Sequence, residues 1–379
     1  MMGFEFKMFN AEPHGRQNVL YTRRSSVAQG ASACRSHDGF AGKDRRGGIM
    51  HWAPSRRRVL AALLASTAGL IGGTRGFAQE APPEITTIRL AKIPGICIAP
   101  QYVAEELLRG EGFTNIEYIE TGVNVYSGFT GGTIDLSMAF IAPYIIQLDT
   151  GLPLVLLGGV HAGCFELFGT ERVKAIRDLK GKTVAVPELG SAHHVFVAAM
   201  ASHVGIDPKR EINFVIHAPI DSMQLLAEGK IDALIGFPPV PQELREKKIG
   251  RVIVSSGLDR PWSQYFCCIV AAHQDFVRKY PVATKRALRA IMKATQFCAA
   301  EPEPAARLVA DKGYRYDYSL QTMKEIQYAR WRDYNPEDTV RFYALRLYEA
   351  GMIKSAPNKI IAQGTDWRFL NELKRELKG

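Results

Sequence analysis

The stretch Asp178–Pro208, DLKGKTVAVPELGSAHHVFVAAMASHVGIDP, decides the fold that the sequence predicts. Its residues Thr183–Val186 are β-branched and apolar, which is typical of a buried strand. Gly190 and Ser191 then begin an apolar helical run that ends at Gly205. We expect Ser191 to cap this helix, whose free N–H groups and positive dipole end favour an anionic or acceptor-rich group. The segment indicates half of a ligand-binding unit, although a capped strand–turn–helix is also common as plain architecture.

Two further segments, one on each side of this stretch, indicate the family that the chain resembles. GTIDLS at 132–137 precedes this stretch and LAEGKIDALIGFPP at 226–239 follows it. With DLKGKTVAV at 178–186, they make most of residues 85–300 resemble the solute-binding proteins of ABC importers. The resemblance is to the nitrate/sulfonate/taurine type, which shares its domain with thiamine-pyrimidine synthases. It implies an α/β fold of the two-lobed periplasmic binding protein type II, with a small solute held between the lobes. It also implies an ABC permease and ATPase as partners.

The remainder of the chain alternates apolar strands with helical segments, which predicts parallel sheets. We expect a first lobe over 84–177 plus 265–379 and a second lobe over 178–264, joined by a two-stranded hinge near 173–180 and 257–265. Helices after 276 carry apolar residues at three- and four-residue spacing, so they should pack on the first lobe. The expected strands are 85–93, 116–120, 134–138, 154–160, 183–187, 212–217, 231–236, 251–255 and 265–272.

The N-terminal part resembles an export signal. SRRRVL at 55–60 begins an apolar run to Ile71, and Gly76, Phe77 and Ala78 follow as a cleavage region. We interpret residues 50–78 as a twin-arginine signal peptide, which predicts a periplasmic protein that begins at Gln79. The apolar run is shorter than the roughly 20 residues that span a bilayer. Residues 1–49 are expected to be an untranslated or disordered leader.

The positive charge of the chain lies mostly in this leader. The sequence has 48 Lys/Arg and 38 Asp/Glu, a net charge of +10. Residues 1–78 contain 12 of the Lys/Arg and 4 of the Asp/Glu residues. The rest of the chain therefore has 36 basic and 34 acidic residues, a net charge of +2. A nearly neutral protein without blocks of like charge is not expected to bind nucleic acid. We expect a monomer without a cofactor.

Five cysteines follow the leader. Adjacent Cys267 and Cys268 lie in the apolar run YFCCIVAA, which predicts a buried strand, and Cys97, Cys164 and Cys298 are isolated. Buried thiols behave as small hydrophobes, so we expect all five to be reduced. Because no CxxC spacing occurs among them, a thiol oxidoreductase is not indicated.

Loops beyond the carboxyl ends of strands are the usual ligand sites of open α/β sheets. This rule nominates the loops at 92–97, 121–124, 140–143, 161–164, 188–194 and 237–239. The expected ligand-binding residues are Lys92, Cys97, Thr121, Asn124, Phe140, His161, Ser191, His193, His194 and Phe237.

Within this set, His193 and His194 point about 100° apart on a helix, so one can face the cleft while the other packs or is solvated. Phe140, Phe237 and Tyr126 are aromatic walls or core residues. Lys92 is the best-placed cation, and Arg260 is a poorer one. Such sparse positive charge disfavours nitrate itself, but the solute stays open among sulfonates, carboxylates, pyrimidines and similar small molecules.

A metal site and catalytic residues are not expected. His161, Cys164 and Glu166 form HxxCxE, which matches no standard zinc spacing. The CCCFC motif of the related pyrimidine synthases is absent, and Phe266–Ile269, FCCI, is the nearest stretch. An exported ligand sensor remains a further alternative to a transport component.

Overall fold

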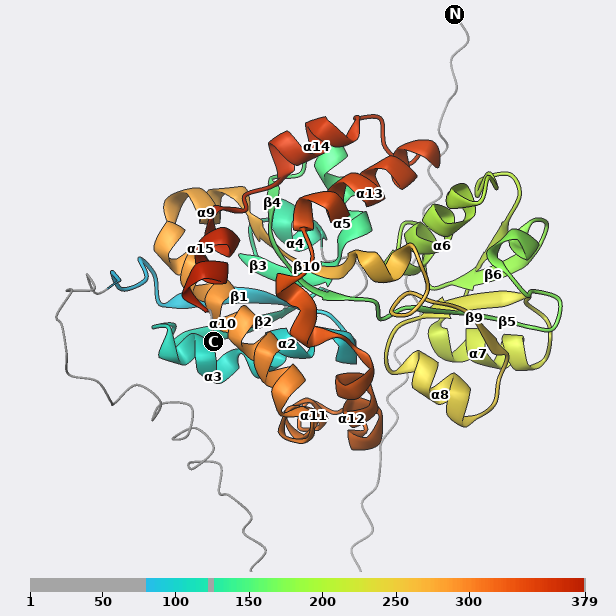
Figure 1. The fold of residues 1–379 in the computed structure, drawn as a ribbon, viewed down its shortest axis with the longest axis horizontal. Helices are drawn as coiled ribbons and strands as arrows, with labels where there is room; N and C mark the ends of the chain where they lie inside the picture. The colour runs from blue at the N-terminus through green and yellow to red at the C-terminus, as the bar shows by residue number, and fades with distance from the viewer. Residues whose placement is uncertain (1–79, 122–125, 378–379) are drawn as a thin grey trace, which may run out of the picture. The chain divides into compact units, whose positions relative to one another are not determined.

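The computed structural model describes residues 80–121 and 126–377. The predicted leader, the signal peptide at 50–78 and Asn124 lie outside these residues. Two five-stranded sheets organise the described chain, in the orders β2-β1-β3-β10-β4 and β7-β6-β8-β5-β9 (Figure 1). We call the first of these sheets, with its helices, lobe 1, and the second sheet, with its helices, lobe 2. The strands of lobe 1 are β1 (Thr87–Lys92), β2 (Asn115–Glu120), β3 (Leu136–Phe140), β4 (Leu154–Ala162) and β10 (Phe266–His273). Those of lobe 2 are β5 (Glu166–Gly169), β6 (Thr183–Val186), β7 (Asn213–Ile216), β8 (Ala233–Gly236) and β9 (Arg251–Ser255).

The sequence predicted parallel sheets, but both sheets are mixed. In lobe 1, β1 pairs in parallel with β2 and β3, whereas β10 runs antiparallel to β3 and β4. In lobe 2, β6 pairs in parallel with β7 and β8, whereas β5 runs antiparallel to β8 and β9. The reversed strands, β5 and β10, are the ones that follow a crossing between the lobes.

The first crossing lies earlier than the sequence predicted. β5 pairs with β8 and β9, so Glu166–Gly169 belongs to lobe 2 and not to the first lobe, which was expected to extend to residue 177. The chain therefore crosses at 163–165, and it returns at 256–265 between β9 and β10. A continuous apolar run hid the change of sheet, because β4 and β5 are separated only by Gly163, Cys164 and Phe165.

Helices of the N-terminal half cover both lobes. Most of them are short, and the segment after the first crossing contains a single 3-10 turn before β6. Lobe 1 contains η2 (Ile96–Ile98), α2 (Ala99–Val103), α3 (Glu105–Gly110), α4 (Tyr126–Thr130) and α5 (Ile141–Asp149). Lobe 2 contains η3 (Ile176–Leu179), α6 (Ala192–His203), α7 (Pro219–Ala227) and α8 (Val240–Glu246), and η4 (Trp262–Gln264) lies in the second crossing.

The C-terminal helices pack on lobe 1, which confirms the predicted arrangement. They are α9 (Gln274–Lys279), α10 (Pro281–Ala300), α11 (Pro302–Ala310), α12 (Tyr316–Glu325), η5 (Tyr328–Arg332), α13 (Pro336–Glu349), α14 (Pro357–Gly364) and α15 (Arg368–Glu376). α10 contacts α2, α3 and η5, and α13 contacts α5 and α14. Proline at the first turn of α10 suits a position whose N–H has no helical partner.

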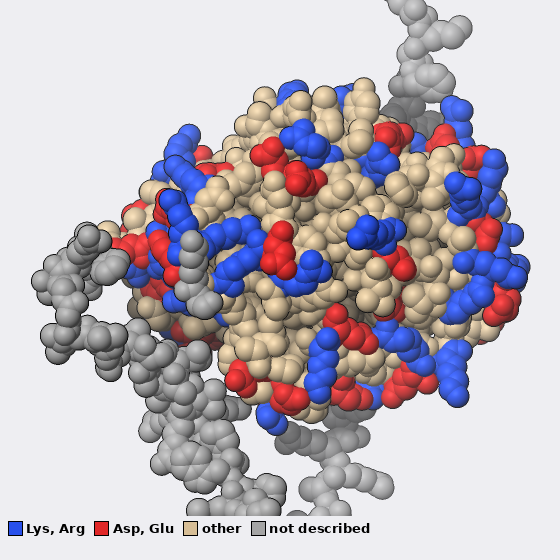
Figure 2. Space-filling view, in the orientation of Figure 1, with Lys and Arg blue, Asp and Glu red and all other residues tan. Residues whose placement is uncertain are grey.

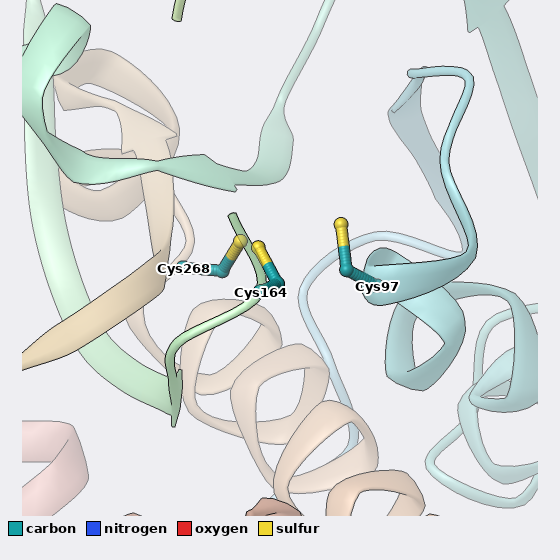
Figure 3. Close-up of side chains that lie close together, drawn as sticks. All are labelled: Cys97, Cys164 and Cys268. Carbon is teal, nitrogen blue, oxygen red and sulfur yellow. The ribbon is translucent and has the colours of Figure 1, made fainter. Parts of the chain in front are cut away.

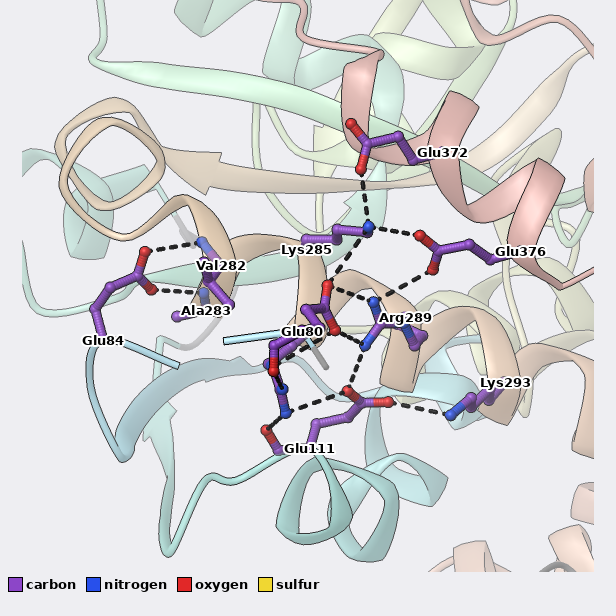
Figure 4. A network of polar contacts seen from close by, with 11 residues as sticks. Glu80, Glu84, Glu111, Val282, Ala283, Lys285, Arg289, Lys293, Glu372 and Glu376 are labelled. Carbon is purple, nitrogen blue, oxygen red and sulfur yellow. Dashed lines mark hydrogen bonds and ion pairs between the residues drawn. The ribbon is translucent and has the colours of Figure 1, made fainter. Parts of the chain in front are cut away.

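An ionic network joins the ends of lobe 1 to α10 (Figure 4). Arg289 donates to Glu111 at 2.8 Å and to Glu80 at 2.7 Å, and only 12% of its side chain is exposed. The hydrogen bond from Arg289 lowers the pKa of Glu80 below its ordinary value. Lys285 bridges to Glu376 of α15 at 2.5 Å. Both ends of the described chain are therefore tied to one helix.

The surface carries both signs of charge. Lys and Arg side chains mix with Asp and Glu on the face drawn in Figure 2, which agrees with the small net charge calculated for residues after 78. Within residues 80–121 and 126–377, no helix combines the length and apolar character that crossing a membrane requires.

Candidate functional site between the lobes

The two crossing segments are fastened to each other by Ser256. Its buried hydroxyl accepts from the N–H groups of Cys164 at 3.1 Å and Phe165 at 2.9 Å. The same hydroxyl donates to the Phe165 carbonyl at 2.9 Å. The Ser256 hydroxyl thereby pairs the N–H groups of Cys164 and Phe165 and the Phe165 carbonyl, as buried polar groups require. The crossings form one connected hinge region beside both sheets.

Two of the predicted loops meet across the lobes. The N–H of Ile96, in the loop after β1, donates to the carbonyl of Pro238, in the loop after β8, at 3.0 Å. A Cβ on Gly95 would lie 2.9 Å from the Phe237 ring, so the backbone of lobe 1 touches this aromatic side chain directly. Tyr314 accepts from the Gly95 N–H at 2.6 Å and holds the loop in place. The carboxyl ends of strands from both sheets thus converge as predicted.

An aromatic cluster fills the space beside this contact. The Phe165 ring lies 5.1 Å from Phe140, 5.3 Å from Phe196 and 5.3 Å from Phe237, measured between centroids. His193 packs on Phe237 at 5.0 Å. Phe140 and Phe165 are buried, so the cluster joins core residues of both lobes. Three predicted residues, Phe140, His193 and Phe237, come together here.

Burial fixes the charge state of His193. Removal of this imidazole from water lowers its pKa to about 4, since desolvation disfavours the charged form. At neutral pH the ring is therefore uncharged, and it offers one donor and one acceptor nitrogen. His193 packs against Phe165 and Phe237 and is the one of the two histidines that belongs to the aromatic cluster.

Ser191 caps α6, as the sequence predicted. Its hydroxyl accepts from the N–H of His194 at 3.3 Å. His194 turns the other way from His193: its Nδ1 accepts from the Gly190 N–H at 3.0 Å, and its ring packs edge-on against Phe214. Burial lowers the pKa of His194 as well. His194 therefore supports the turn instead of joining the aromatic cluster.

The predicted ligand-binding residues Lys92 and Thr121 lie outside the aromatic cluster. Lys92, at the end of β1, forms an exposed ion pair with Glu120 at 2.6 Å. Thr121 directs its hydroxyl to the Lys92 carbonyl at 3.5 Å in an exposed contact. Asn124 lies outside the described residues. Lys92 is therefore engaged by a carboxylate, and neither Lys92 nor Thr121 belongs to the aromatic cluster.

His161 and Cys97 lie deeper, beside cysteines that the sequence predicted to be core thiols. Sulfur atoms of Cys97, Cys164 and Cys268 lie within 4.8 Å of one another (Figure 3). The Cys164 and Cys267 sulfurs are 3.1 Å apart. His161 is fully buried beside this group and packs against Tyr328 at 5.2 Å. All five cysteines of the described chain are free thiols.

Ionic contacts join the lobes at α8 and α12, and sequence reasoning missed them. Arg245 of α8 contacts Glu166 at 2.5 Å within lobe 2 and Glu325 of α12 at 2.8 Å in lobe 1. Gln242 donates to Thr322 at 3.2 Å across the same junction. Burial raises the pKa of Glu166, and the charge of Arg245 opposes that rise. The partners lie about 80 positions apart in the sequence, so no local signal announces them.

Two hollows among the described residues each lie within a single lobe. A cavity of about 10 Å³ lies beside His193, between Pro187, Ser222 and Val240, which is room for one water at most. A larger hollow of about 430 Å³ lies on lobe 1. Its lining contains none of the ten predicted residues and consists of Val155, Gln274, Val277, Arg278, Pro281, Thr365, Asp366 and Arg368. The lobes meet instead through the Ile96–Pro238 hydrogen bond and the aromatic cluster.

Curated relatives are solute-binding proteins and pyrimidine synthases. The nitrate/nitrite binding protein NrtA of Nostoc sp. is 24% identical over 269 residues, which are 62% of this chain and 60% of that protein. The taurine-binding periplasmic protein of Escherichia coli is 23% identical, over 48% of this chain and 57% of its own. The pyrimidine phosphate synthase THI5 of Saccharomyces cerevisiae is 25% identical, over 53% and 60%. The chain thus spans less than two thirds of each.

Solved structures confirm the fold. The periplasmic nitrate-binding protein NrtA from Synechocystis PCC 6803 superposes with a TM-score of 0.66 and 16% identity, over 79% of this chain and 90% of that one. A putative sulfonate-binding protein SsuA from Methylobacillus flagellatus KT gives a TM-score of 0.60 and 20% identity, over 78% and 95%. Both are periplasmic binding proteins, as the resemblance implied. The model of the NMT1-like family matches residues 81–311, more than half of the sequence, and the chain therefore belongs to the NMT1-like family.

Proposed function

We propose that this protein is the extracytoplasmic solute-binding component of an ABC importer. It captures a small solute between its lobes and delivers it to a membrane permease and ATPase. The observation that carries the proposal is the meeting of strand-end loops from two sheets, with the Ile96 N–H bonded to the Pro238 carbonyl across them. The relatives named for nitrate and taurine binding support the same role. Export by the twin-arginine route to the periplasm, as a monomer, completes the proposal.

Closure is the proposed working motion. The Ile96–Pro238 hydrogen bond joins loops of the two lobes in the described form, so we propose that the lobes separate to admit a solute. The crossings at 163–165 and 256–265 are the connections about which they turn. A solute that touches both lobes only when they are closed shifts the equilibrium toward that form. No bond needs to be made or broken for this activity.

The chemistry of the aromatic cluster favours a flat, weakly charged solute. Phe237 and the neutral ring of His193 offer stacking faces, and Ser191 offers a hydroxyl at a helix start. The candidate cation Lys92 is paired with Glu120. A heteroaromatic or aromatic carboxylate solute fits these groups better than a small inorganic anion, which needs many donors. On this basis we propose Phe237, His193 and Ser191 as the principal ligand-binding residues of the ten predicted, and the roles of the other seven stay predictions.

A thermal-shift screen tests the proposal. The panel contains a pyrimidine, an aromatic carboxylate, taurine, an alkanesulfonate and nitrate. A solute at about 100 times its dissociation constant stabilises the folded state by roughly 2.7 kcal/mol. We expect an aromatic member to raise the melting temperature, and Phe237→Ala to lose this rise while Phe214→Ala, in the same lobe, keeps it. A rise with nitrate alone would contradict the solute class, and no rise with any member would count against a solute-binding role.

A second candidate is an enzyme of the pyrimidine-synthase type, favoured by the match to THI5. We propose binding rather than catalysis, because the CCCFC motif is absent and FCCI stands in its region. Mass spectrometry of the small molecule released after denaturation separates the two. A binding protein returns its solute unchanged in a 1:1 ratio, whereas an enzyme returns a product of different mass.

A further inference from the structure

Three cysteine side chains from separate parts of lobe 1 and the hinge converge on one point. Cys97 comes from η2 after β1, Cys164 from the first crossing, and Cys268 from β10 (Figure 3). Their sulfur atoms lie within 4.8 Å of one another. Since a thiolate binds a metal such as Zn²⁺ at about 2.3 Å, sulfurs around one ion are roughly 3.8–4 Å apart. The group is therefore close to the spacing of a three-sulfur metal site before any ion is added.

The surroundings supply an independent indication. His161 lies opposite Cys268 on the paired strands β4 and β10 and is fully buried. Its Nε2 has no hydrogen-bond partner among the described residues. Leaving a buried polar atom unpaired costs about 1–3 kcal/mol, so such an atom needs an explanation. His161 borders the cysteine group on the paired strand, but its nitrogen atoms are not among the ligand atoms that lie within 4.8 Å of one another.

The backbone around the cysteines is held in place. The Tyr328 hydroxyl donates to the Cys97 carbonyl at 3.0 Å, and Ser256 accepts from the Cys164 N–H at 3.1 Å. Cys268 is fixed in a buried strand that pairs on both sides. The Cys267 sulfur is 3.1 Å from that of Cys164, but Cys267 is not part of the convergent group of three. Ligands that are already oriented lose little conformational entropy when an ion binds.

The donor set selects the kind of ion. Sulfur ligands favour soft cations such as Cu⁺ and Zn²⁺, whereas Mg²⁺ and Ca²⁺ require oxygen ligands. Zn²⁺ in closed sites takes four ligands, and the convergent group has three. We propose that Cys97, Cys164 and Cys268 form a buried three-sulfur site for one thiophilic monovalent cation, Cu⁺. Each thiol that binds releases its proton to solvent, and the ion keeps its oxidation state. The site shares Cys97 with the ten predicted solute-binding residues, whereas Cys164 and Cys268 lie outside that set.

The test is a Cu⁺ titration of the full chain under anaerobic, thiol-free reducing conditions, in competition with the chromogenic chelator bicinchoninate. We expect one Cu⁺ per chain to leave the chelator, with ultraviolet absorption from sulfur-to-copper charge transfer. Cys97→Ser and Cys268→Ser should each weaken binding at least tenfold. Cys298→Ser removes a buried cysteine of α10 outside the group and should bind as the parent does.

Circular dichroism of each variant before titration separates lost ligands from lost folding. If Cys268→Ser does not fold, Cys97→Ser decides the result. The proposal is overturned if the parent chain takes no Cu⁺ from the chelator, or if Cys298→Ser weakens binding as much as Cys97→Ser. A Zn²⁺ titration run in parallel checks the coordination: tight 1:1 Zn²⁺ binding without Cu⁺ binding would refute the three-sulfur Cu⁺ site in favour of a four-ligand one.

Discussion

Gly163 and Gly257 are the point at which the two crossing segments touch. A Cβ placed on Gly163 would lie 2.1 Å from the Gly257 Cα, closer than any non-bonded contact allows. Gly163 also has a φ of 56°, in the left-handed region that favours glycine. Gly257 is different, because a Cβ there would meet nothing nearer than 3.9 Å. The contact is therefore one-sided: only Gly163 must lack a side chain.

Gly163→Ala should disrupt the hinge region. The clash with Gly257 adds strain of roughly 1–3 kcal/mol, and the left-handed backbone adds roughly 1–2 kcal/mol. We therefore expect the free energy of unfolding to fall by about 3 kcal/mol. Gly257→Ala, the matched control, should cost less than about 1 kcal/mol. Urea denaturation of both variants measures the difference. Equal stability of the two would mean that the crossings do not touch as described.

Arg245 should contribute more to stability than a nearby surface arginine. It is 28% exposed and contacts Glu166, which is 16% exposed, together with Glu325. We expect Arg245→Met to cost about 2 kcal/mol, because it leaves the buried Glu166 carboxylate unpaired. Arg315→Met, which breaks the more exposed pair with Glu246, should cost about 0–1 kcal/mol. Urea denaturation at pH 7 compares the two variants, and equal losses would show that burial of the pair adds nothing.

The Arg245 effect should depend on pH in a defined direction. Burial raises the pKa of Glu166, and loss of Arg245 removes the charge that opposes this rise. A carboxyl with a raised folded-state pKa costs stability as pH rises above its ordinary value of 4.5, and costs nothing once protonated in both states. The deficit of Arg245→Met should therefore shrink as pH falls toward 4.5. A deficit that is constant from about pH 7 down to the ordinary pKa would rule out this cause.

His193 should make the protein less stable in acid. Its pKa is about 4 when folded and 6.5 ordinarily, so the unfolded chain binds the proton more readily between these values. Stability contributed by the neutral ring is complete above 6.5 and is lost as pH falls toward 4, by about 3 kcal/mol in total. His193→Phe should flatten this part of the pH profile of stability. His194 and His203, whose pKa values are also lowered, are present in both proteins, so their contribution is the same in each profile. Identical profiles for parent and variant would show that His193 is not buried as a neutral group.

Ser191 should serve both the helix and the solute. Ser191→Ala removes the hydroxyl that accepts from His194, and we expect a loss of roughly 1 kcal/mol in stability. Ser191→Gly should cost only a few tenths of a kcal/mol, since glycine is tolerated at a cap. Both should weaken solute binding by about 1–3 kcal/mol if the hydroxyl pairs with a buried acceptor of the solute. Calorimetry with Ser191→Gly decides: parent-like affinity would leave the hydroxyl a structural role alone.

The helix cap, the buried strand and the ligand loops could be predicted because neighbouring residues in the sequence determine them. Ser191 was identifiable as a cap because the residue type and the helix start are adjacent in the chain. The strand at Thr183–Val186 was identifiable from its β-branched run between a glycine and a proline. The convergence of the 92–97 and 237–239 loops followed from the rule that ligand loops lie beyond strand ends.

Pairing over long distances explains what sequence reasoning missed. Glu166–Gly169 continues an apolar run, and only its bonds to β8 and β9 place it in lobe 2. Arg245 and Glu325 meet through the packing of α8 on α12, which no spacing encodes. Cys97, Cys164 and Cys268 are isolated in the sequence, so the fold alone brings their sulfur atoms together.

Small-angle X-ray scattering of the chain from Gln79 to Gly379, with and without the solute selected by the thermal-shift screen, tests lobe closure most directly. Without solute, we predict a radius of gyration larger than that calculated from the closed structure, because the lobes separate about the crossings at 163–165 and 256–265. Saturating solute should reduce the radius to the calculated value. A solute-free profile that already matches the closed structure, and does not change at saturation, would contradict the clamp.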